Sequence, residues 1–452
     1  LKIAPDMRVT TQASSGNTGR WLIDPTDFTI TAGSSDQTTN SIGAATLQNA
    51  LASSDVTIAT SATDTTGQSG DIHVNSAVAW SAHKLTLTAH RNINVNAVMT
   101  ASGAASLDLN TAAAGNGGEV NMAMGATDFT GRIDFGGSGA LRINTNSYSV
   151  IQDAAGLQGI NSAGLSGYYA LGSDVSLSGI ANFVPIGSVS SLFTGRFNGL
   201  GHRVTDLNIN QSSISSFVGL FAHVSSSAQI ENVNLVNGSV SGGSYTGSLA
   251  GRSMGTIRNV LTGVNVTGQD SVGGLVGAND AENGGVTTGK NASISNSHAS
   301  GNVIGASSYV GGLVGRNAAG SGASVPGTAT GGNAIVQDSS ATGAVIGSAY
   351  GVGGLIGLSQ NGSRPSTYDF MTYPYTYRYG GYGGVAMINR SFATGAVSSI
   401  YQRAGGLVGE NYGTIAQSFS TSNLTANHAA GGLVGVNWDS GSISDSYARG
   451  SV

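Results

Sequence analysis

Residues 272–277 read VGGLVG, and this short glycine-rich motif decides the fold because near copies of it recur along the chain. The copies are VGGLVG at 310–315, VGGLIG at 352–357, AGGLVG at 404–409 and 430–435, and the more divergent FVGLFA at 217–222 and TGSLAG at 246–251. The central leucines of successive copies are 29, 26, 38, 42, 52 and 26 residues apart. Because recurrence every 20–50 residues or so is the signature of a repeat architecture, we infer a base unit of 26 residues with inserts in the longer repeats.

Each repeat also carries a short β-branched segment that begins with an aliphatic residue. A polar residue follows two positions after this aliphatic residue, and a second aliphatic residue follows nine positions after it. The opening residues are Ile257, Ile294, Val336, Ile388, Ile415 and Ile443, the polar ones are Asn259, Asn296, Asp338, Arg390, Gln417 and Asp445, and the second aliphatics are Val266, Val303, Val345, Val397 and Leu424. About three short strands per repeat cannot form a core alone, but parallel stacking of the repeats aligns their aliphatic residues in columns. The sequence therefore predicts an all-β protein, a right-handed parallel β-helix with polar ladders at its corners.

The first part of the chain alternates apolar and polar residues without the Gly-Gly-Leu motif, a pattern typical of half-buried strands. Such segments lie at 55–60, 70–78, 84–99, 106–110, 118–122 and 140–144. We therefore expect one β-helix to continue through three regions: 1–150, a lead-in at 151–215, and the repeats at 216–452. A short helical turn is expected at the junction, within 148–164.

The composition excludes several classes of protein. Of 452 residues, 39% are hydrophobic and only 9% are charged, and the net charge is −5, so the chain is neither typically disordered nor suited to nucleic acid. No apolar run approaches 18 residues, which predicts no transmembrane segment. The chain contains no cysteine, which excludes disulfides, thiol nucleophiles and cysteine-bound zinc. Because the last residues stop inside a repeat, we expect the chain to be a segment of a longer protein.

Two stretches carry a resemblance to a known family. GRWLIDPTDFTI at 19–30, followed by 70–103, resembles the region after the secretion domain in two-partner-secretion exoproteins, the filamentous-haemagglutinin-like and high-molecular-weight-type bacterial adhesins. The GGLVG units are similar to GLUG repeats, and FTGRFNGLGHRVTDLNI at 193–209 resembles the usual lead-in to them. The resemblance implies an extracellular β-helical shaft, exported by an outer-membrane transporter of a Gram-negative bacterium, that adheres to cells, other bacteria or biofilm polysaccharide.

The extra residues of the long repeats all enter at one position, between the GGLVG motif and the next aliphatic strand. They lie near 278–293, 316–334 and 358–387. Since one position in consecutive coils maps to one side of a solenoid, we expect the three inserts to cluster on one face, where repeat proteins commonly bind partners. The first insert contains DAEN at 280–283, for which we expect a solvated acidic turn in preference to a calcium site.

The third insert concentrates aromatic residues and is the candidate ligand-binding segment. The candidate residues are Tyr368, Phe370, Tyr373, Tyr375, Tyr377, Arg378, Tyr379 and Tyr382. Four of the tyrosines alternate with other residues, so an extended strand would present their rings on one side. Tyrosine combines an apolar face with a hydroxyl, which suits a carbohydrate, a cell-surface or matrix ligand, or another copy of the chain. The alternatives are a β-hairpin whose rings pack on the shaft and a lid over neighbouring turns.

We expect no enzymatic activity and no cofactor or metal. Parallel β-helices also include polysaccharide-degrading enzymes, whose chemistry needs two closely placed carboxylates. Asp338 and Asp445 occupy equivalent repeat positions but lie three coils apart, and no nucleophile elbow, phosphate-binding loop or compact histidine motif is present. A polysaccharide-degrading enzyme and a passive stalk that presents an adhesive tip elsewhere remain the alternatives to an adhesin.

Overall fold

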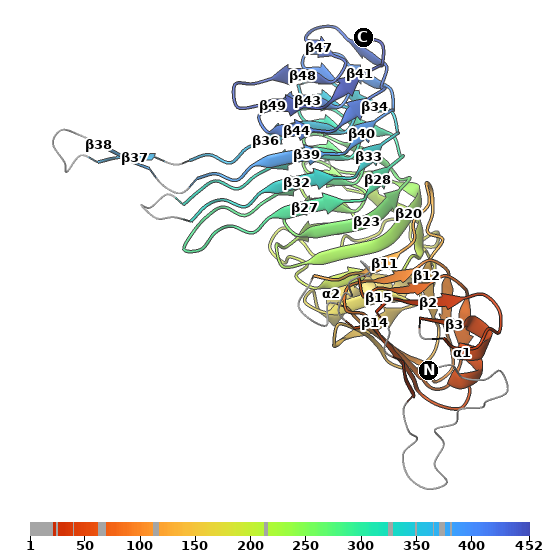
Figure 1. Cartoon of the computed structure of the whole chain (residues 1–452). Helices are drawn as coiled ribbons and strands as arrows, with labels where there is room; N and C mark the ends of the chain where they lie inside the picture. Colours follow the sequence, from red (N-terminus) through yellow and green to blue (C-terminus); the bar gives the residue numbers. More distant parts are fainter. Residues whose placement is uncertain are drawn as a thin grey trace.

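The computed structural model describes residues 21–23, 26–38, 40–61, 69–111, 117–211, 216–323, 329–348, 350–364, 366–369, 376–379 and 382–452, without the side chains of 21–23, 366–369 and 376–379. Within these ranges the chain is almost entirely β-structure, and parallel strands stack coil upon coil into a β-helix (Figure 1). The predicted fold class is therefore confirmed. The two helices are α1 (Ala44–Leu51) and α2 (Ala154–Ala163).

The largest sheet of the repeats contains the aliphatic segments predicted above. Its central strands are β23 (Thr256–Thr262), β27 (Ala292–Ser295), β32 (Ala334–Gln337), β39 (Ala386–Asn389), β44 (Thr414–Ala416) and β49 (Ser442–Ser444). Beside them run β28 (His298–Ala299), β33 (Ser340–Ala341), β40 (Phe392–Ala393), β45 (Phe419–Ser420), β50 (Tyr447–Ala448), and then β24 (Asn265–Gly268), β29 (Val303–Gly305), β34 (Val345–Gly347), β41 (Val397–Ser399) and β46 (Leu424–Ala426). The six opening aliphatics stand in register from coil to coil, as predicted.

The repeat motif itself forms the other two sheets. The residues before its leucine form β21 (Thr246–Gly247), β25 (Val272–Gly273), β30 (Val310–Gly311), β35 (Val352–Gly353), β42 (Ala404–Gly405) and β47 (Ala430–Gly431). The residues after it form a seven-stranded sheet, here called the motif sheet: β19 (Phe221–Val224), β22 (Ala250–Ser253), β26 (Val276–Asp280), β31 (Val314–Ala318), β36 (Ile356–Gln360), β43 (Val408–Asn411) and β48 (Val434–Asn437). The leucines between them, from Leu220 to Leu407, are fully buried in one core.

The glycines of the motif are required by close backbone contacts. A Cβ on Gly311 would lie 2.0 Å from the carbonyl oxygen of Val314, and one on Gly312 would lie 2.2 Å from the carbonyl oxygen of Gly354 in the next coil. Neither distance leaves room for a carbon atom. Glycine therefore lets the chain turn the corner while the next coil packs directly on it.

Polar ladders mark the corner of the largest sheet, as the sequence predicted, and the structure adds that the residues at this corner are left-handed. The six polar residues two positions after the aliphatics all have φ between 45° and 53°, a conformation that asparagine and aspartate adopt more readily than other residues with a side chain. The Asn296 side chain donates to Asn259 (2.8 Å), and Asn259 donates to Asn232 (2.9 Å). Further along the stack, Arg390 forms a bidentate ion pair with Asp338 (2.6 and 2.7 Å).

The amino-terminal region is a β-helical unit whose core also includes Ala170, Leu200 and Leu261 of the part that follows. Its three sheets contain β1 (Trp21–Ile23), β4 (Val56–Ala59), β7 (Lys84–Thr88), β10 (Ser106–Asn110) and β13 (Leu141–Ile143); β3 (Ser41–Gly43), β2 (Phe28–Thr31), β5 (Ile72–Val74), β8 (Ile93–Val95) and β11 (Val120–Met122); and β6 (Val78–Trp80), β9 (Val98–Ala101) and β12 (Arg132–Phe135). Helix α1, which the sequence analysis missed, packs Leu47 and Leu51 into this core. The spacing of its apolar residues was the available signal.

The expectation that one helix continues through both halves is wrong. Strand β13 pairs antiparallel with β14 (Asn146–Ile151) across a tight turn whose residues Asn144 and Thr145 have φ of 49° and 68°. This turn reverses the chain, so a second stack starts at β14. It continues through α2, at the predicted junction, and through β15 (Tyr168–Leu171), β16 (Val175–Ser176), β17 (Arg196–Asn198), β18 (Arg203–Asn210) and β20 (Gln229–Ser241) into the repeats.

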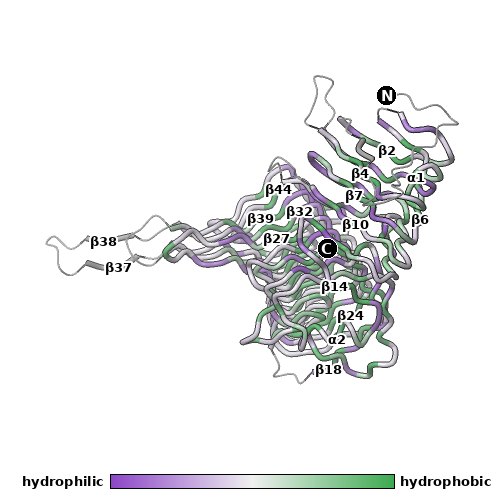
Figure 2. Tube along the Cα trace, turned by 90° about the horizontal axis from the view of Figure 1, so that it is seen from below, coloured by the Kyte–Doolittle hydropathy of each residue, from purple (hydrophilic) through white to green (hydrophobic). Residues whose placement is uncertain are grey.

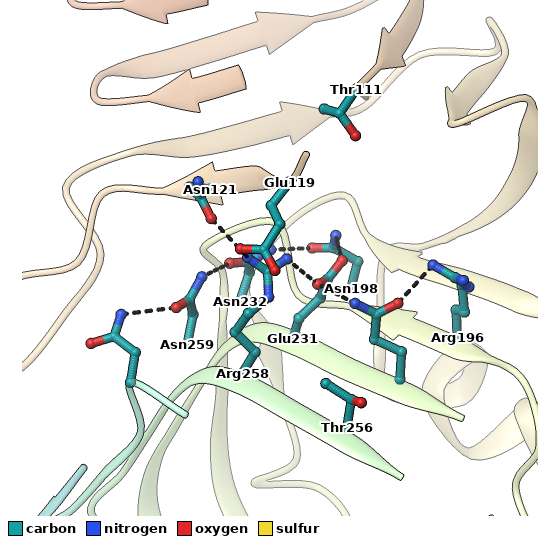
Figure 3. A network of polar contacts seen from close by, with 12 residues as sticks. Thr111, Glu119, Asn121, Arg196, Asn198, Glu231, Asn232, Thr256, Arg258 and Asn259 are labelled. Atoms are coloured by element: carbon teal, nitrogen blue, oxygen red, sulfur yellow. Dashed lines mark hydrogen bonds and ion pairs between the residues drawn. The ribbon is translucent and has the colours of Figure 1, made fainter. Parts of the chain in front are cut away.

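A polar network joins the two units (Figure 3). Arg258 of β23 donates to Glu119 and Asn121 of the amino-terminal unit, and its other terminal nitrogen donates to Glu231 of β20. Only 9% of the Arg258 and Glu231 side chains is exposed, so this ion pair is largely withdrawn from water. Asn198 also donates to Glu231 (2.8 Å), which ties the carboxylate to the polar ladder.

Candidate functional site

The three inserts leave the motif sheet at the same point of successive coils, directly after β26, β31 and β36. They project together from one side of the stack, as both views show (Figures 1 and 2). The predicted clustering of the inserts on one face is therefore confirmed. We call residues 281–291, 319–333 and 361–385 the arm.

Backbone contacts between glycines hold the arm together. The Gly320 N–H donates to the Gly332 carbonyl of its own coil (2.9 Å), and Gly332 donates to Glu282 of the preceding coil (2.8 Å). From the following coil, Gly384 donates to Gly320 (2.8 Å). A Cβ on Gly320 would lie 1.8 Å from the Glu282 carbonyl oxygen, so these contacts need glycine. The inserts thus form a connected extension of the shaft.

The tyrosine-rich segment contains a β-hairpin beyond this glycine-packed part. Strand β37 (Ser366–Asp369) pairs antiparallel with β38 (Thr376–Tyr379), which sets Tyr368 opposite Tyr377 and Thr367 opposite Arg378. In both views the two strands lie at the far end of the arm, away from the coils (Figures 1 and 2). The backbone therefore carries this segment outward from the shaft.

Most of the candidate side chains lie outside the described residues. They are the side chains of Tyr368, Tyr377, Arg378 and Tyr379, and the whole of Phe370, Tyr373 and Tyr375. The direction of these rings stays a prediction. Tyr382 is described: it is 63% exposed, and the guanidinium carbon of Arg364 lies 4.1 Å from the centre of its ring, a cation–π contact at the start of the segment.

The sequence analysis missed a second group of aromatic residues, which lines the corner before the motif sheet. At this corner the residue directly before each motif, or the first residue in the divergent copy at 217–222, has φ between 43° and 69°; these residues are Phe217, Tyr245, Ser271, Tyr309, Gly351, Arg403 and Ala429. Large side chains are uncommon in this conformation. Alignment of the repeats on their leucines would have exposed the recurrence of rings here. We call the following residues the strip: Phe217, Tyr245, Tyr309, Tyr350, Arg403, Tyr412 and Trp438.

Arg403 organises the carboxy-terminal part of the strip. Its guanidinium carbon lies 5.2 Å from the ring centres of both Tyr350 and Trp438, and its Nη1 lies 3.0 Å from Glu410 Oε1. Trp438 donates its indole N–H to the other oxygen of Glu410 (3.2 Å) and stacks on Tyr412 with ring centres 5.3 Å apart. The hydrogen bond to Glu410 raises the pKa of Arg403 above its usual value. The rings and charges are therefore mutually oriented.

A polar groove lies at the root of the arm, beside the strip. It has a volume of about 490 Å³, and its lining includes Arg252, Asp280, Arg316, Gln360, Asn361 and Ser363. Arg252 and Arg316 occupy equivalent positions two coils apart. Arg252 Nε donates to Asp280 Oδ2 (2.9 Å), while Arg316 Nε lies 3.7 Å from Asp280 Oδ1.

Asp280 corrects the expectation of a solvated acidic turn at 280–283. Its side chain is only 8% exposed, because it ends β26 within the motif sheet and lies between the two arginines. Among the described residues no three histidine, aspartate or glutamate side chains are grouped as a metal site. Neither α1 nor α2 has the length and hydropathy that a bilayer span requires.

Burial of histidines makes the stability of the repeats sensitive to pH. Burial and the charge of Arg252 lower the pKa of His223, and burial lowers the pKa of His298, below the ordinary 6.5. As pH falls through 6.5 the unfolded chain takes up these protons first, so the stabilisation is complete above that pH and is lost below it. We expect the urea midpoint to fall between pH 7.5 and pH 5.5, and to fall less in His223→Gln.

The control for this measurement is substitution of the exposed His428 by glutamine. A His428→Gln chain should retain the full pH dependence of the wild type. An equal pH dependence in wild type and His223→Gln would contradict the assignment. Asp71 and Asp128 do not contribute to the pH dependence measured above pH 5. Hydrogen bonds from Arg91 and Arg203 lower the pKa values of these carboxyl groups, which therefore stay ionised in this range.

Comparisons with known proteins give partial matches. The model of the GLUG motif matches residues 426–452. Halomucin from Haloquadratum walsbyi is 42% identical over 103 residues, which is 22% of this chain and 1% of that protein. A solved structure of a candidate immunoglobulin A1 protease from Bacteroides ovatus covers 67% of this chain and 84% of its own, with 18% identity and a TM-score of 0.46. The shared features are therefore the GLUG motif and a segment similar to a small part of halomucin.

Proposed function

We propose that this chain is a non-catalytic segment of a large extracellular surface protein, an adhesin whose β-helical shaft carries the arm as its contact surface. The GLUG match and the similarity to halomucin support a large extracellular surface protein. The proposal adds that the chain attaches to cells, matrix polysaccharide or other copies of itself. It also adds that the chain is exported through an outer-membrane transporter of a Gram-negative bacterium. A passive stalk and a polysaccharide-degrading enzyme are the competing functions.

One observation carries the proposal: the three inserts are hydrogen-bonded into a single arm that holds the tyrosine-rich hairpin away from the coils. A segment that only spaces two other domains has no need of such an extension. Held beyond the shaft, exposed tyrosines would offer rigid contact area at low entropic cost. The arm therefore supports binding over a purely mechanical role.

The test is replacement of Tyr373, Tyr375, Tyr377 and Tyr379 by serine in the whole chain. We expect binding to a glycan array, to bacterial cells or to a second copy of the chain to weaken about tenfold or more, since the loss of only one or two ring contacts, each worth roughly 1 kcal/mol, already gives about a tenfold change. Unchanged circular dichroism would show that the fold persists.

A matched control is Tyr401→Ser, which removes a tyrosine that is 56% exposed and lies off the arm; binding should be unchanged. Absence of any binding by the wild-type chain would favour the passive stalk. Release of soluble sugars from a polysaccharide by the purified chain would favour the enzyme.

A further inference from the structure

We propose that the groove and the adjoining strip form a second binding surface, which takes an uncharged polysaccharide chain laid along the stacking axis. This surface lies where the root of the arm joins the shaft and does not include the tyrosine-rich hairpin. It extends the proposed function, because it names a ligand class and a place for it, and it can be tested without the arm tip.

The first support comes from polar atoms that no other described residue satisfies. Asp280 Oδ1 and Arg316 Nε are both buried, lie 3.7 Å apart, and have no hydrogen-bond partner. Buried polar atoms are nearly always hydrogen-bonded, because leaving one unpaired costs about 1–3 kcal/mol. A sugar hydroxyl both donates and accepts. The Arg316 side chain is 32% exposed, so its other guanidinium N–H groups can donate to such a hydroxyl.

Charge balance selects an uncharged ligand. The groove is lined by two guanidinium groups, Arg252 and Arg316, and by two carboxylates, Asp280 and Glu282. Glu282 accepts hydrogen bonds from Ser226 and from the Lys290 N–H, which keep it at the root of the arm. An anionic polymer would meet both carboxylates, and a cationic one would meet both arginines.

The remaining lining has the chemistry that recognises hydroxyl groups. Gln360 and Asn361 contribute amides, and Ser321 and Ser363 contribute hydroxyls whose oxygens lie 2.9 Å apart on neighbouring coils. These groups are uncharged donors and acceptors. The two serines occupy equivalent positions on successive coils, which suits a polymer better than a single sugar.

The strip supplies aromatic faces next to the groove. The guanidinium carbon of Arg252, a groove residue, lies 6.0 Å from the centre of the Phe217 ring, and the Phe217 and Tyr245 ring centres are 5.0 Å apart. Tyr309 occupies the same corner two coils beyond Tyr245. Beyond it, Tyr350 is 45% exposed and flanks Arg403. Aromatic faces pack against the apolar C–H face of a sugar ring, while charged and amide groups bind its hydroxyls.

The test measures the affinity of the whole chain for soluble polysaccharides by gel retardation, with neutral glucan and galactomannan against anionic alginate. We expect retardation by at least one neutral polymer, with affinity reduced about tenfold in Arg316→Ala, which removes a charged donor. Gln360→Ala tests the same groove at an exposed side chain, and should also weaken retardation if Arg316→Ala disturbs folding. Arg390→Ala, on the largest sheet, should leave the affinity unchanged.

The possible outcomes separate this proposal from the arm-tip proposal. Loss of affinity in the groove variants, with full affinity in the four-tyrosine serine variant, supports the groove. Loss in the tyrosine variant alone overturns the groove and leaves the arm tip standing. Retardation by alginate only, abolished by salt, overturns the assignment of an uncharged ligand, and retardation by none of the polymers overturns the groove altogether.

Discussion

Gly320→Val is expected to unfold the arm while the coils of the shaft stay folded. The valine Cβ would lie 1.8 Å from the Glu282 carbonyl oxygen and 2.4 Å from its carbon. Both are backbone atoms, so a side-chain rotation cannot relieve the clash. Gly320 also accepts from Gly384 and donates to Gly332, and moving it therefore breaks contacts to two other segments of the arm.

The measurement is hydrogen exchange of the arm amides, compared with amides in the largest sheet. A destabilisation of about 3 kcal/mol, at the upper end for an overpacked position, corresponds to a roughly hundredfold loss of protection. Protection in β27 and β32 should persist near their carboxyl ends. Binding that depends on the arm tip should weaken in parallel, because the hairpin loses its support.

Gly285→Val is the matched control within the same arm. A Cβ at Gly285 meets no atom within 4 Å, so this variant adds the same side chain without a clash. Equal exchange in both variants would show that the glycines are not needed for packing. The arm would then be held by its root alone.

Arg258→Met is expected to destabilise the chain by about 3–5 kcal/mol, the usual cost of removing one partner of a buried ion pair. The Glu231 side chain is 9% exposed and would keep only its amide partners. The same substitution removes the contacts to Glu119 and Asn121, so the amino-terminal unit should also separate from the repeats. Urea unfolding followed by circular dichroism measures the loss.

Two further variants identify the cause. Arg258→Met combined with Glu231→Gln should recover part of the stability, because the unpaired buried charge is gone. Arg390→Met breaks an ion pair whose side chains are 49% and 40% exposed, and should cost much less stability than Arg258→Met, because water screens exposed ion pairs. A similar cost for Arg258→Met and Arg390→Met would mean that the network in Figure 3 does not join the two units.

Much of the repeat architecture was predictable because each coil places the same kinds of residue at the same positions. The leucine of each motif, the aliphatic residue of each strand and the left-handed polar residue at each corner recur at fixed offsets, so one correct coil predicts the next. The reversal at Asn144 and Thr145 was not predictable in this way. It occurs once, in a tight turn, and the strands on either side have the same alternating pattern.

The candidate binding surfaces were also predictable only in part. The inserts and their common face followed from the spacing of the repeats, and the tyrosine-rich segment was visible as composition. Asp280 was misjudged because it stands in sequence beside Glu282 and Asn283, while its neighbours in space are Arg252 and Arg316 from other coils. The strip was missed because its rings are separated by whole repeats.

The sequence by itself determined that the repeats stack as a parallel β-helix and that the inserts leave it on one side, since periodic side chains and glycines define the coil and its corners locally. Only the tertiary structure showed that the chain reverses direction between two units, that backbone contacts of glycines join the inserts into one arm, and that a groove forms at the root of this arm. These features depend on contacts between residues tens of positions apart, such as Gly320 with Glu282 and Arg258 with Glu119. Whether such residues meet is set by how many coils separate them and by the side on which each coil presents them.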